Sequence, residues 1–340
     1  MGSEFESSFN SEFNPITRKI VRLLSNNSRI TISEMAKELG ISRSTAAGRL
    51  KKIEQALHIT YTLELNPVKL GLANPHMILV KFKKRPDYAD VGKRLLSYYI
   101  TQFAARIHGT YDLLICANAY SLPEYLTWDM KMRAQMMHRY EGMQWQTSDV
   151  SFNRLGYVPI RGEAINHAKI PKRHKKMLGI LNSNSRISLN RLSKEMRMNY
   201  KSTVYNFNSL VGQGYIKRFT ICLDPGKNVS LITMFETFIP TLDYAGVEKV
   251  SDAYFKPDDR NPLISRNLLV SHLVGNYDYF SLGAYDNFKA GYENGVKRYQ
   301  RMFKDFELKK VEYGEVSEVL IGLLPVRSVD TAKEFRHFHI

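Results

Sequence analysis

A short motif occurs twice in this chain of 340 residues, and the repeat limits the folds that the chain can adopt. Residues 25–45 read SNNSRITISEMAKELGISRST, and residues 183–202 read SNSRISLNRLSKEMRMNYKS. The two stretches align without a gap, so that Arg29 corresponds to Arg186 at an offset of 157 residues (186 − 29 = 157). Sequence similarity that returns at a fixed distance indicates two copies of one structural unit.

The first copy of the motif has the pattern of a helix, a tight turn and a second helix. Thr31 and Glu34 have the spacing of a capping box, and apolar residues follow at helical spacing. Gly40 can end this helix in a left-handed conformation, and Ser42 can cap the next one. The second helix keeps small and basic residues on its outer face, as a helix that enters the major groove of DNA requires. The DNA contacts predicted for this copy are Arg43, Ser44, Arg49, Lys51 and Lys52.

The segments around the motifs repeat as well. A helical segment precedes the first motif, and ITYTLEL after it predicts a wing or a connecting strand. The next stretch has the ferredoxin-like order β-α-β-β-α-β, in which two helices cover one face of an antiparallel sheet. The sequence therefore predicts an α+β protein with two repeats of a (winged) helix-turn-helix followed by a ferredoxin-like domain. The expected boundaries are 1–13 for a disordered tag, 14–66 and 172–224 for the helix-turn-helix domains, 76–161 and 229–327 for the ferredoxin-like domains, 162–171 for a surface linker and 328–340 for a tail.

Composition and spacing exclude several classes of function. No stretch approaches the roughly 18–20 apolar residues that cross a bilayer, so we expect no membrane partner. Cys116 and Cys222 stand alone without a Cys/His cluster, so we expect reduced core residues and no metal. No phosphate-binding loop or nucleophile elbow is present, so we expect neither an enzyme nor a cofactor. The N-terminus lacks the basic start and apolar run of a secretory signal, so we expect a cytoplasmic, nucleoid-associated protein. The net charge of +16 favours a polyanionic partner, and charge alone does not distinguish nucleic acid from an anionic membrane surface.

The order and spacing of these motifs resemble the leucine-responsive regulatory protein/AsnC family of transcriptional regulators. The resemblance rests on RITISEMAKELGIS, on GRLKKIE after it, and on a Gly-x-Tyr-Asp turn in each ferredoxin-like segment. Two copies of the family's unit, one after the other, account for nearly the whole chain, whereas family members usually carry one unit per chain. The resemblance implies a regulator that binds double-stranded DNA, is pseudo-dimeric in one chain, assembles into a homo-oligomer and is modulated by an amino acid or related small effector.

The turns GTYD (109–112) and GNYD (275–278) are the candidate effector site. In the family this turn lines the effector pocket between two sensor domains, which the ferredoxin-like domains would be here. The alternative is a hairpin turn in which Gly supplies an unusual backbone conformation and Asp bonds the local backbone. The effector-binding residues that the resemblance implies are Gly109, Tyr111, Asp112, Gly275, Tyr277 and Asp278.

The second helix-turn-helix carries different chemistry. At the offset of 157, Arg43 becomes Tyr200 and Lys51 becomes Asn208, while the basic residues move to the preceding helix. We predict that this copy holds phosphates and offers Asn and Tyr to base edges, with Asn206 or Asn208 favouring adenine, so that the DNA site is asymmetric. The alternative is a dimerisation bundle that no longer contacts DNA. The contacts predicted for the second copy are Arg191, Lys194, Arg197, Tyr200, Lys201, Asn206 and Asn208.

Two other functions fit the same outline. Tetrapyrrole (siroheme-type) decarboxylases resemble this two-domain architecture in paired copies. The basic recognition helix, and the lack of a His/Arg-rich segment for tetrapyrrole carboxylates, disfavour that function. A weakly specific nucleoid-associated DNA-binding protein would suit the net charge of +16.

Overall fold

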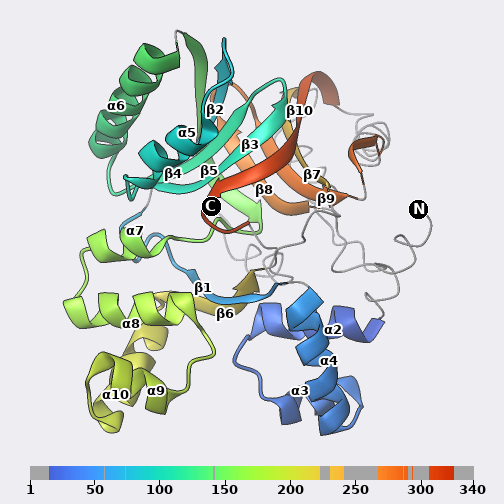
Figure 1. Cartoon of the computed structure of the whole chain (residues 1–340), viewed down its shortest axis with the longest axis vertical. Coiled ribbons are helices and arrows are strands. Elements are labelled where there is room, and N and C mark those ends of the chain that lie inside the picture. The colour runs from blue at the N-terminus through green and yellow to red at the C-terminus, as the bar shows by residue number, and fades with distance from the viewer. Residues whose placement is uncertain are drawn as a thin grey trace.

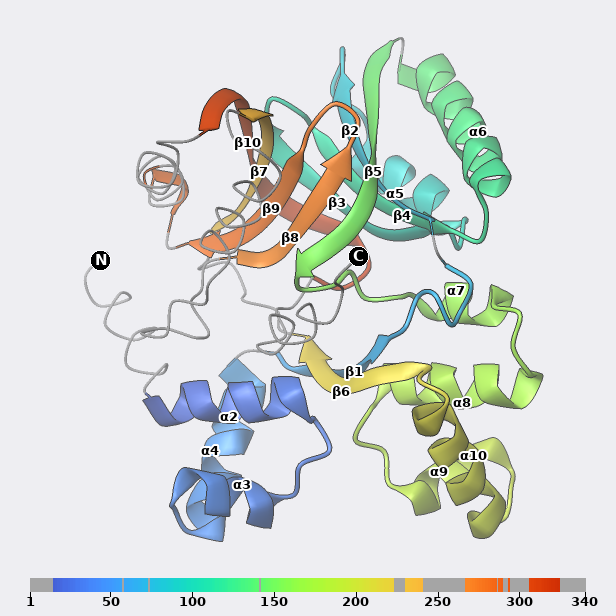
Figure 2. The same ribbon diagram turned by 180° about the vertical axis from the view of Figure 1, so that it is seen from behind.

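The computed structural model describes residues 15–56, 58–72, 74–140, 142–222, 230–240, 267–285, 287–289, 293 and 306–324. They form a closed barrel and two helical units that lie side by side at one end of it, with a two-stranded ribbon in between (Figure 1). Figure 2 shows the same arrangement from behind. The predicted fold class is confirmed: a winged helix-turn-helix is followed by an α+β sheet domain. No helix in the described ranges is both long and apolar enough to cross a membrane.

The first helical unit consists of the three helices that the sequence predicts. Helix α3 (Ile32–Leu39) begins with the predicted capping box: Glu34 N donates to Thr31 Oγ1 at 3.2 Å, and Thr31 N donates to Glu34 Oε2 at 2.8 Å. It ends at Gly40, whose φ of +65° lies in the left-handed region. Ser42 Oγ then accepts from the backbone N–H of Thr45 at 3.1 Å. The other two helices are α2 (Pro15–Asn26) and α4 (Arg43–Ala56).

The second helical unit repeats this arrangement with different caps. Ser188 accepts a hydrogen bond from Arg191 N at the start of α9 (Leu189–Met196). Asn199 accepts one from Ser202 N at the start of α10 (Tyr200–Gly212). The three helices of this unit are α8 (Lys172–Ser183), α9 and α10.

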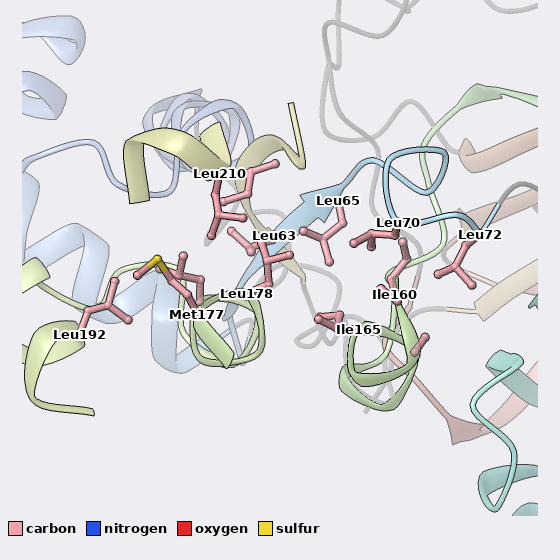
Figure 3. Packing of buried hydrophobic residues seen from close by; sticks show 14 of the residues in the cluster. Leu63, Leu65, Leu70, Leu72, Ile160, Ile165, Met177, Leu178, Leu192 and Leu210 are labelled. Carbon is pink, nitrogen blue, oxygen red and sulfur yellow. The ribbon is translucent and has the colours of Figure 1, made fainter. Parts of the chain in front are cut away.

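The ribbon consists of β1 (Thr60–Leu65) and β6 (Ile216–Cys222), which pair antiparallel. Each strand contributes a fully buried residue to the core of the helical unit from the other half of the chain, and Ile216 of β6 also belongs to the core of the second helical unit. Leu63 of β1 is fully buried in the core of the second helical unit, together with Leu210 of α10 (Figure 3). Ile221 of β6 is fully buried in the core of the first helical unit. Neither helical unit therefore has a complete apolar core without the strand from the other half.

The barrel strands come from both halves of the chain in the order β10-β3-β4-β2-β5-β8-β9-β7. Two four-stranded sheets join at both edges, through the antiparallel pairs β5–β8 and β3–β10, so that the barrel has no unpaired edge. Their inner faces share one apolar core, which includes Phe103 and Leu114 from the first half and Phe280 and Leu282 from the second. The strands are β2 (Asn74–Phe82), β3 (Thr101–Gly109), β4 (Leu113–Ala119), β5 (Met143–Leu155), β7 (Ser230–Pro240), β8 (Asn267–Val274), β9 (Tyr279–Tyr285) and β10 (Phe306–Ile321).

Helices α5 (Tyr88–Leu96) and α6 (Leu122–Tyr140) cover the outer face of the first sheet (Figure 1). Trp128 of α6 and Ile78 of β2 belong to the apolar cluster between these helices and the sheet. Of the helices expected in the second ferredoxin-like domain, only Phe288, Lys289 and Glu293 are among the described residues, and all three are helical. The expected tag and tail lie outside the described residues.

The segment 162–171 is more ordered than the surface linker that we expected. It contains helix α7 (Gly162–His167), and Ala164 and Ile165 are fully buried in the cluster that holds Leu63 (Figure 3). Tyr120 Oη donates to the backbone oxygen of Ala164 at 2.8 Å, which ties α7 to the barrel. The expectation was wrong because the basic residues of this stretch obscured its small apolar face.

Candidate nucleic-acid interface

The two helical units meet through equivalent residues of the repeated motif. Ser28 Oγ and Ser185 Oγ share a buried hydrogen bond of 2.6 Å, and these residues are 157 positions apart in the chain. The backbone N–H of Ser28 donates to Phe219 O at 2.8 Å, and that of Ser185 donates to Tyr61 O at 3.1 Å. Contact between equivalent residues is the pattern of an isologous, two-fold arrangement, and we call this contact the two-fold contact.

Two arginines cross this contact in opposite directions. Arg29 Nη1 donates to the backbone oxygens of Ser185 at 2.6 Å and Ile187 at 3.0 Å. Arg186 Nη2 donates to the backbone oxygen of Ile30 at 3.3 Å. Each guanidinium also lies over an aromatic ring of the other half of the chain. Burial and the nearby charge of Arg186 lower the pKa of Arg29. The sequence shows that Arg29 aligns with Arg186, but we did not predict that either arginine contacts the other half of the chain.

The recognition helix of the first helical unit presents its predicted contacts to solvent. Helices α4 and α10 both lie at the end of the molecule away from the barrel (Figures 1 and 2). On α4, the side chains of Arg43, Ser44, Lys51 and Lys52 are exposed, and Arg49 is half-buried. The exposed cations and the N-terminal end of α4 form a surface suited to phosphate groups.

Helix α10 of the second helical unit differs from our expectation at one position. Tyr200, Lys201 and Asn208 are exposed, as a base or phosphate contact requires. Asn206 is 5% exposed, and its Nδ2 donates to the backbone oxygen of Ser202 at 2.6 Å. The prediction that Asn206 reads adenine is therefore wrong, because its amide is turned into its own helix. Asn208 remains the candidate for that role.

Helix α9 and the turn after it carry the other predicted contacts. Arg191, Lys194 and Arg197 are exposed, and Arg191 Nε lies 3.1 Å from Glu195 Oε1. Arg197 has a φ of +55° at the position where the first helical unit has Gly40. A side chain in this conformation costs backbone energy that glycine avoids.

We expect Arg197→Gly to stabilise the protein by up to about 1 kcal/mol, because it removes the strain of a left-handed side-chain-bearing residue. The gain is limited because glycine also gives the unfolded chain more backbone freedom. Gly40→Arg should destabilise it by a similar amount, since the space around Gly40 is open and only the backbone conformation opposes a side chain. Denaturant unfolding of both variants measures the two changes. A loss of stability in Arg197→Gly would mean that contacts of the arginine outweigh the strain.

The two Gly-x-Tyr-Asp turns meet inside the barrel through their tyrosines. Tyr111 Oη and Tyr277 Oη share a buried hydrogen bond of 2.6 Å. Tyr111 Oη is also 2.7 Å from Gln146 Oε1, and Tyr277 Oη donates to Glu312 Oε2. Burial raises the pKa of both tyrosines. Burial also opposes ionisation of Glu312, but hydrogen bonds from Lys310, Tyr277 and Tyr111 leave the pKa of Glu312 below its ordinary value. We did not predict Gln146 or Glu312.

The other residues of these turns have local roles in this structure. Asp112 accepts hydrogen bonds from Lys81 Nζ at 2.9 Å and from Phe82 N at 2.8 Å. A Cβ on Gly109 would lie 2.1 Å from Tyr313 O, so the close approach of β10 requires glycine there. The backbone oxygen of Asp278 accepts from Leu273 N at 2.8 Å. Gly275 approaches Ser148 of β5, as Gly109 approaches β10. That Gly109, Asp112, Gly275 and Asp278 contact an effector stays a prediction.

The first helical unit is similar to helix-turn-helix domains of known proteins. Residues 13–56 match the family described as winged helix-turn-helix DNA-binding. An uncharacterized HTH-type transcriptional regulator of Pyrococcus horikoshii is 29% identical over 108 residues, which cover 32% of this chain and 67% of that protein. The HTH-type transcriptional regulator FL11 of Pyrococcus abyssi is 30% identical over 101 residues, which cover 29% of this chain and 66% of FL11. The alignments thus span about two thirds of each relative and under one third of this chain.

Among solved structures, the siroheme decarboxylase NirDL aligns with nearly the whole chain. The alignment covers 94% of this chain and 96% of NirDL, with a TM-score of 0.56 and 12% identity. NirDL in complex with an iron-uroporphyrin III analogue aligns with a TM-score of 0.57 and 10% identity. At these identities the likeness shows a shared fold alone. LrpC of B. subtilis aligns over 41% of this chain and 95% of its own, with 23% identity and a TM-score of 0.36.

Proposed function

We propose that the chain is a transcriptional regulator that binds double-stranded DNA with both helical units of one molecule. The two-fold contact through Ser28 and Ser185 carries this proposal, because it sets two recognition helices on one face of a single chain. Dimeric helix-turn-helix proteins use such a pair to bind two half-sites on one side of the duplex. The net charge of +16 and the similarity of the first helical unit to HTH-type regulators support the same function.

Selection of bound duplexes from a random library, followed by footprinting, tests the proposal. We expect one chain to protect two adjacent segments about 10 base pairs apart, centre to centre. A single protected segment, or no enrichment of any sequence, would contradict it. Genome-wide mapping of bound DNA then identifies the regulated genes. We also propose that several chains form a homo-oligomer, which light scattering measures directly.

The proposal includes a small effector, an amino acid in the first instance, that binds in the barrel near Tyr111 and Tyr277. Its support is the convergence of the two tyrosine hydroxyls with Gln146 and Glu312 among apolar side chains. Small-molecule sites combine an apolar lining with a few polar groups that orient the ligand. A ligand ammonium could pair with the Glu312 carboxylate.

A saturating effector should raise the stability of the wild-type chain by about 2.7 kcal/mol at 100 times its Kd. Thermal-shift screening of amino acids and related metabolites measures this change. We expect the Tyr111→Phe, Tyr277→Phe double variant to lose the shift, because it keeps both rings and removes both hydroxyls. Tyr140→Phe is the matched control, since its hydroxyl donates to Asp90 outside the barrel. A ligand whose shift survives the double variant binds elsewhere.

A tetrapyrrole-binding function is the second candidate, and the full-length fold likeness to NirDL is the observation that favours it. Titration with iron-uroporphyrin distinguishes the two. A regulator should leave the porphyrin absorbance unchanged, whereas a saturable spectral change abolished by mutations inside the barrel would favour the tetrapyrrole function.

A further inference from the structure

We propose that the second helical unit binds DNA through backbone phosphates alone, while the first helical unit reads the bases. The clamp residues are Lys194, Arg197 and Lys201, which lie on α9, on the turn after it and in the first turn of α10. The inference rests on the proposed function and gives the two copies of the motif different tasks. It also differs from the sequence-based prediction that Asn and Tyr side chains of α10 read base edges.

The outer face of α10 is poorly shaped for reading bases. Tyr205 is 74% exposed, and it stands where the first helical unit has Gly48. A side chain at Gly48 would meet nothing within 4 Å, so that position points into open space on α4. A phenol ring at the equivalent place keeps the backbone of α10 away from the floor of the major groove. The burial of Asn206 removes a second candidate base contact.

The second helical unit nevertheless carries most of the positive charge. Residues 172–222 contain eleven Lys and Arg residues against one acidic residue, a net charge of +10. The equally long segment 15–65 contains nine against four, a net charge of +5. Only Lys201 among the eleven lies on α10, so this charge surrounds the recognition helix instead of lining it. Phosphate binding depends on such cations, whatever the base sequence.

Arg197 gives a separate reason to place phosphates at the clamp residues. In a helix-turn-helix, the helix before the recognition helix crosses the DNA backbone, and α9 and the turn after it hold Lys194 and Arg197. The turn keeps an arginine in a left-handed conformation where Gly40 serves the first helical unit without strain. Strain of this kind accumulates at functional sites. Within the described residues, none of the three clamp residues forms an ion pair.

The two-fold contact lets phosphate binding by the second helical unit position the first helical unit on the DNA. Ser28, Ser185 and the two crossing arginines hold the helical units in one orientation. Phosphate contacts of the second helical unit therefore place α4 at a set distance along the duplex. They add affinity for any DNA and leave discrimination between sequences to the first helical unit.

The experiment compares two triple variants on two duplexes. The clamp variant is Lys194→Ala, Arg197→Gly, Lys201→Ala, and the reader variant is Arg43→Ala, Lys51→Ala, Lys52→Ala. One duplex is a site selected by the wild-type chain, and the other is the same site scrambled. Fluorescence anisotropy gives both affinities across a range of salt concentrations. Arg197→Gly is used because glycine suits the left-handed turn, so the clamp variant keeps its fold.

We expect the clamp variant to lose about 10²-fold in affinity at 0.15 M salt for both duplexes, and its log–log salt slope to flatten by about 2.7 units. The ratio between selected and scrambled affinities should not change. The reader variant should lower that ratio, and Tyr205→Ala should leave it unaltered. A clamp variant or Tyr205→Ala variant with a lower ratio would show that the second helical unit reads bases.

Unchanged affinity and slope in the clamp variant would show that the second helical unit does not touch DNA, which also overturns the inference. Both of these failures leave the wild-type preference for the selected site intact. Loss of the proposed function appears differently, as a wild-type chain with no preference between the two duplexes.

Discussion

Replacing Ile221 by Ala should loosen the first helical unit and leave the second largely intact, although Ile221 belongs to the second half of the sequence. Its side chain is fully buried among apolar residues of α2, α3 and α4. Deleting such a side chain costs about 2–5 kcal/mol, because the cavity that remains is only partly refilled. Hydrogen exchange measured on peptides from α2–α4 and from α8–α10 reports the effect on each helical unit separately.

The matched variant is Leu63→Ala. Leu63 of β1 pairs with Phe219 of β6, which lies two residues before Ile221. Leu63 is fully buried in the core of the second helical unit, so this variant should loosen α8–α10 and spare α2–α4. Val68→Ala serves as the control, since Val68 is 70% exposed and its truncation should change stability by less than about 0.5 kcal/mol. If Ile221→Ala loosened α8–α10 and Leu63→Ala loosened α2–α4, these two side chains would not complete the cores that we assign to them.

Replacing Lys51 and Lys52 by Ala should weaken DNA binding about 30-fold at 0.15 M salt, if each lysine contacts one phosphate. Both side chains are exposed on α4, beside the half-buried Arg49. The log–log salt slope should flatten by up to about two units, because each lost contact removes about 0.9. Anisotropy titrations between 50 and 300 mM salt, at roughly five concentrations, determine both quantities.

A variant with the same loss of charge elsewhere separates contact from net charge. Lys93 and Lys131 are exposed, and their helices α5 and α6 lie on the outer side of the barrel, away from α4 and α10. Their replacement by Ala should change the slope little, since charges beyond a Debye length of about 8 Å are screened. An unaltered slope in the Lys51→Ala, Lys52→Ala variant would place these lysines off the DNA.

The sequence by itself determined where the helices of the first motif begin and end. The capping box of Thr31 and Glu34, the left-handed Gly40 and the cap at Ser42 all occur as predicted. These features depend on residues within one or two turns of each other, so local spacing is enough to specify them. The order of strands and helices in the first ferredoxin-like segment was readable for the same reason.

The side-chain roles on α10 were only partly readable. Asn206 and Asn208 are equally polar in the sequence, yet one is buried and the other exposed. Their exposure depends on which face of α10 packs on the rest of the helical unit. Asn206 lies on the face that also buries Thr203 and Leu210. Its amide could be turned inward because a carbonyl one turn earlier accepts its hydrogen bond.

The tertiary structure alone decided how the two copies of the motif fit together. Sequence alignment showed that Ser28 matches Ser185 and Arg29 matches Arg186, but an alignment cannot show that matching residues touch. β1 and β6 pair with each other, and each contributes a buried residue to the helical unit from the other half of the chain, which brings the two motifs together. This arrangement depends on which apolar core each side chain of the ribbon enters, and Leu63 and Ile221 would suit either core by composition. Only packing between segments about 157 residues apart selects one arrangement, so local sequence patterns do not record it.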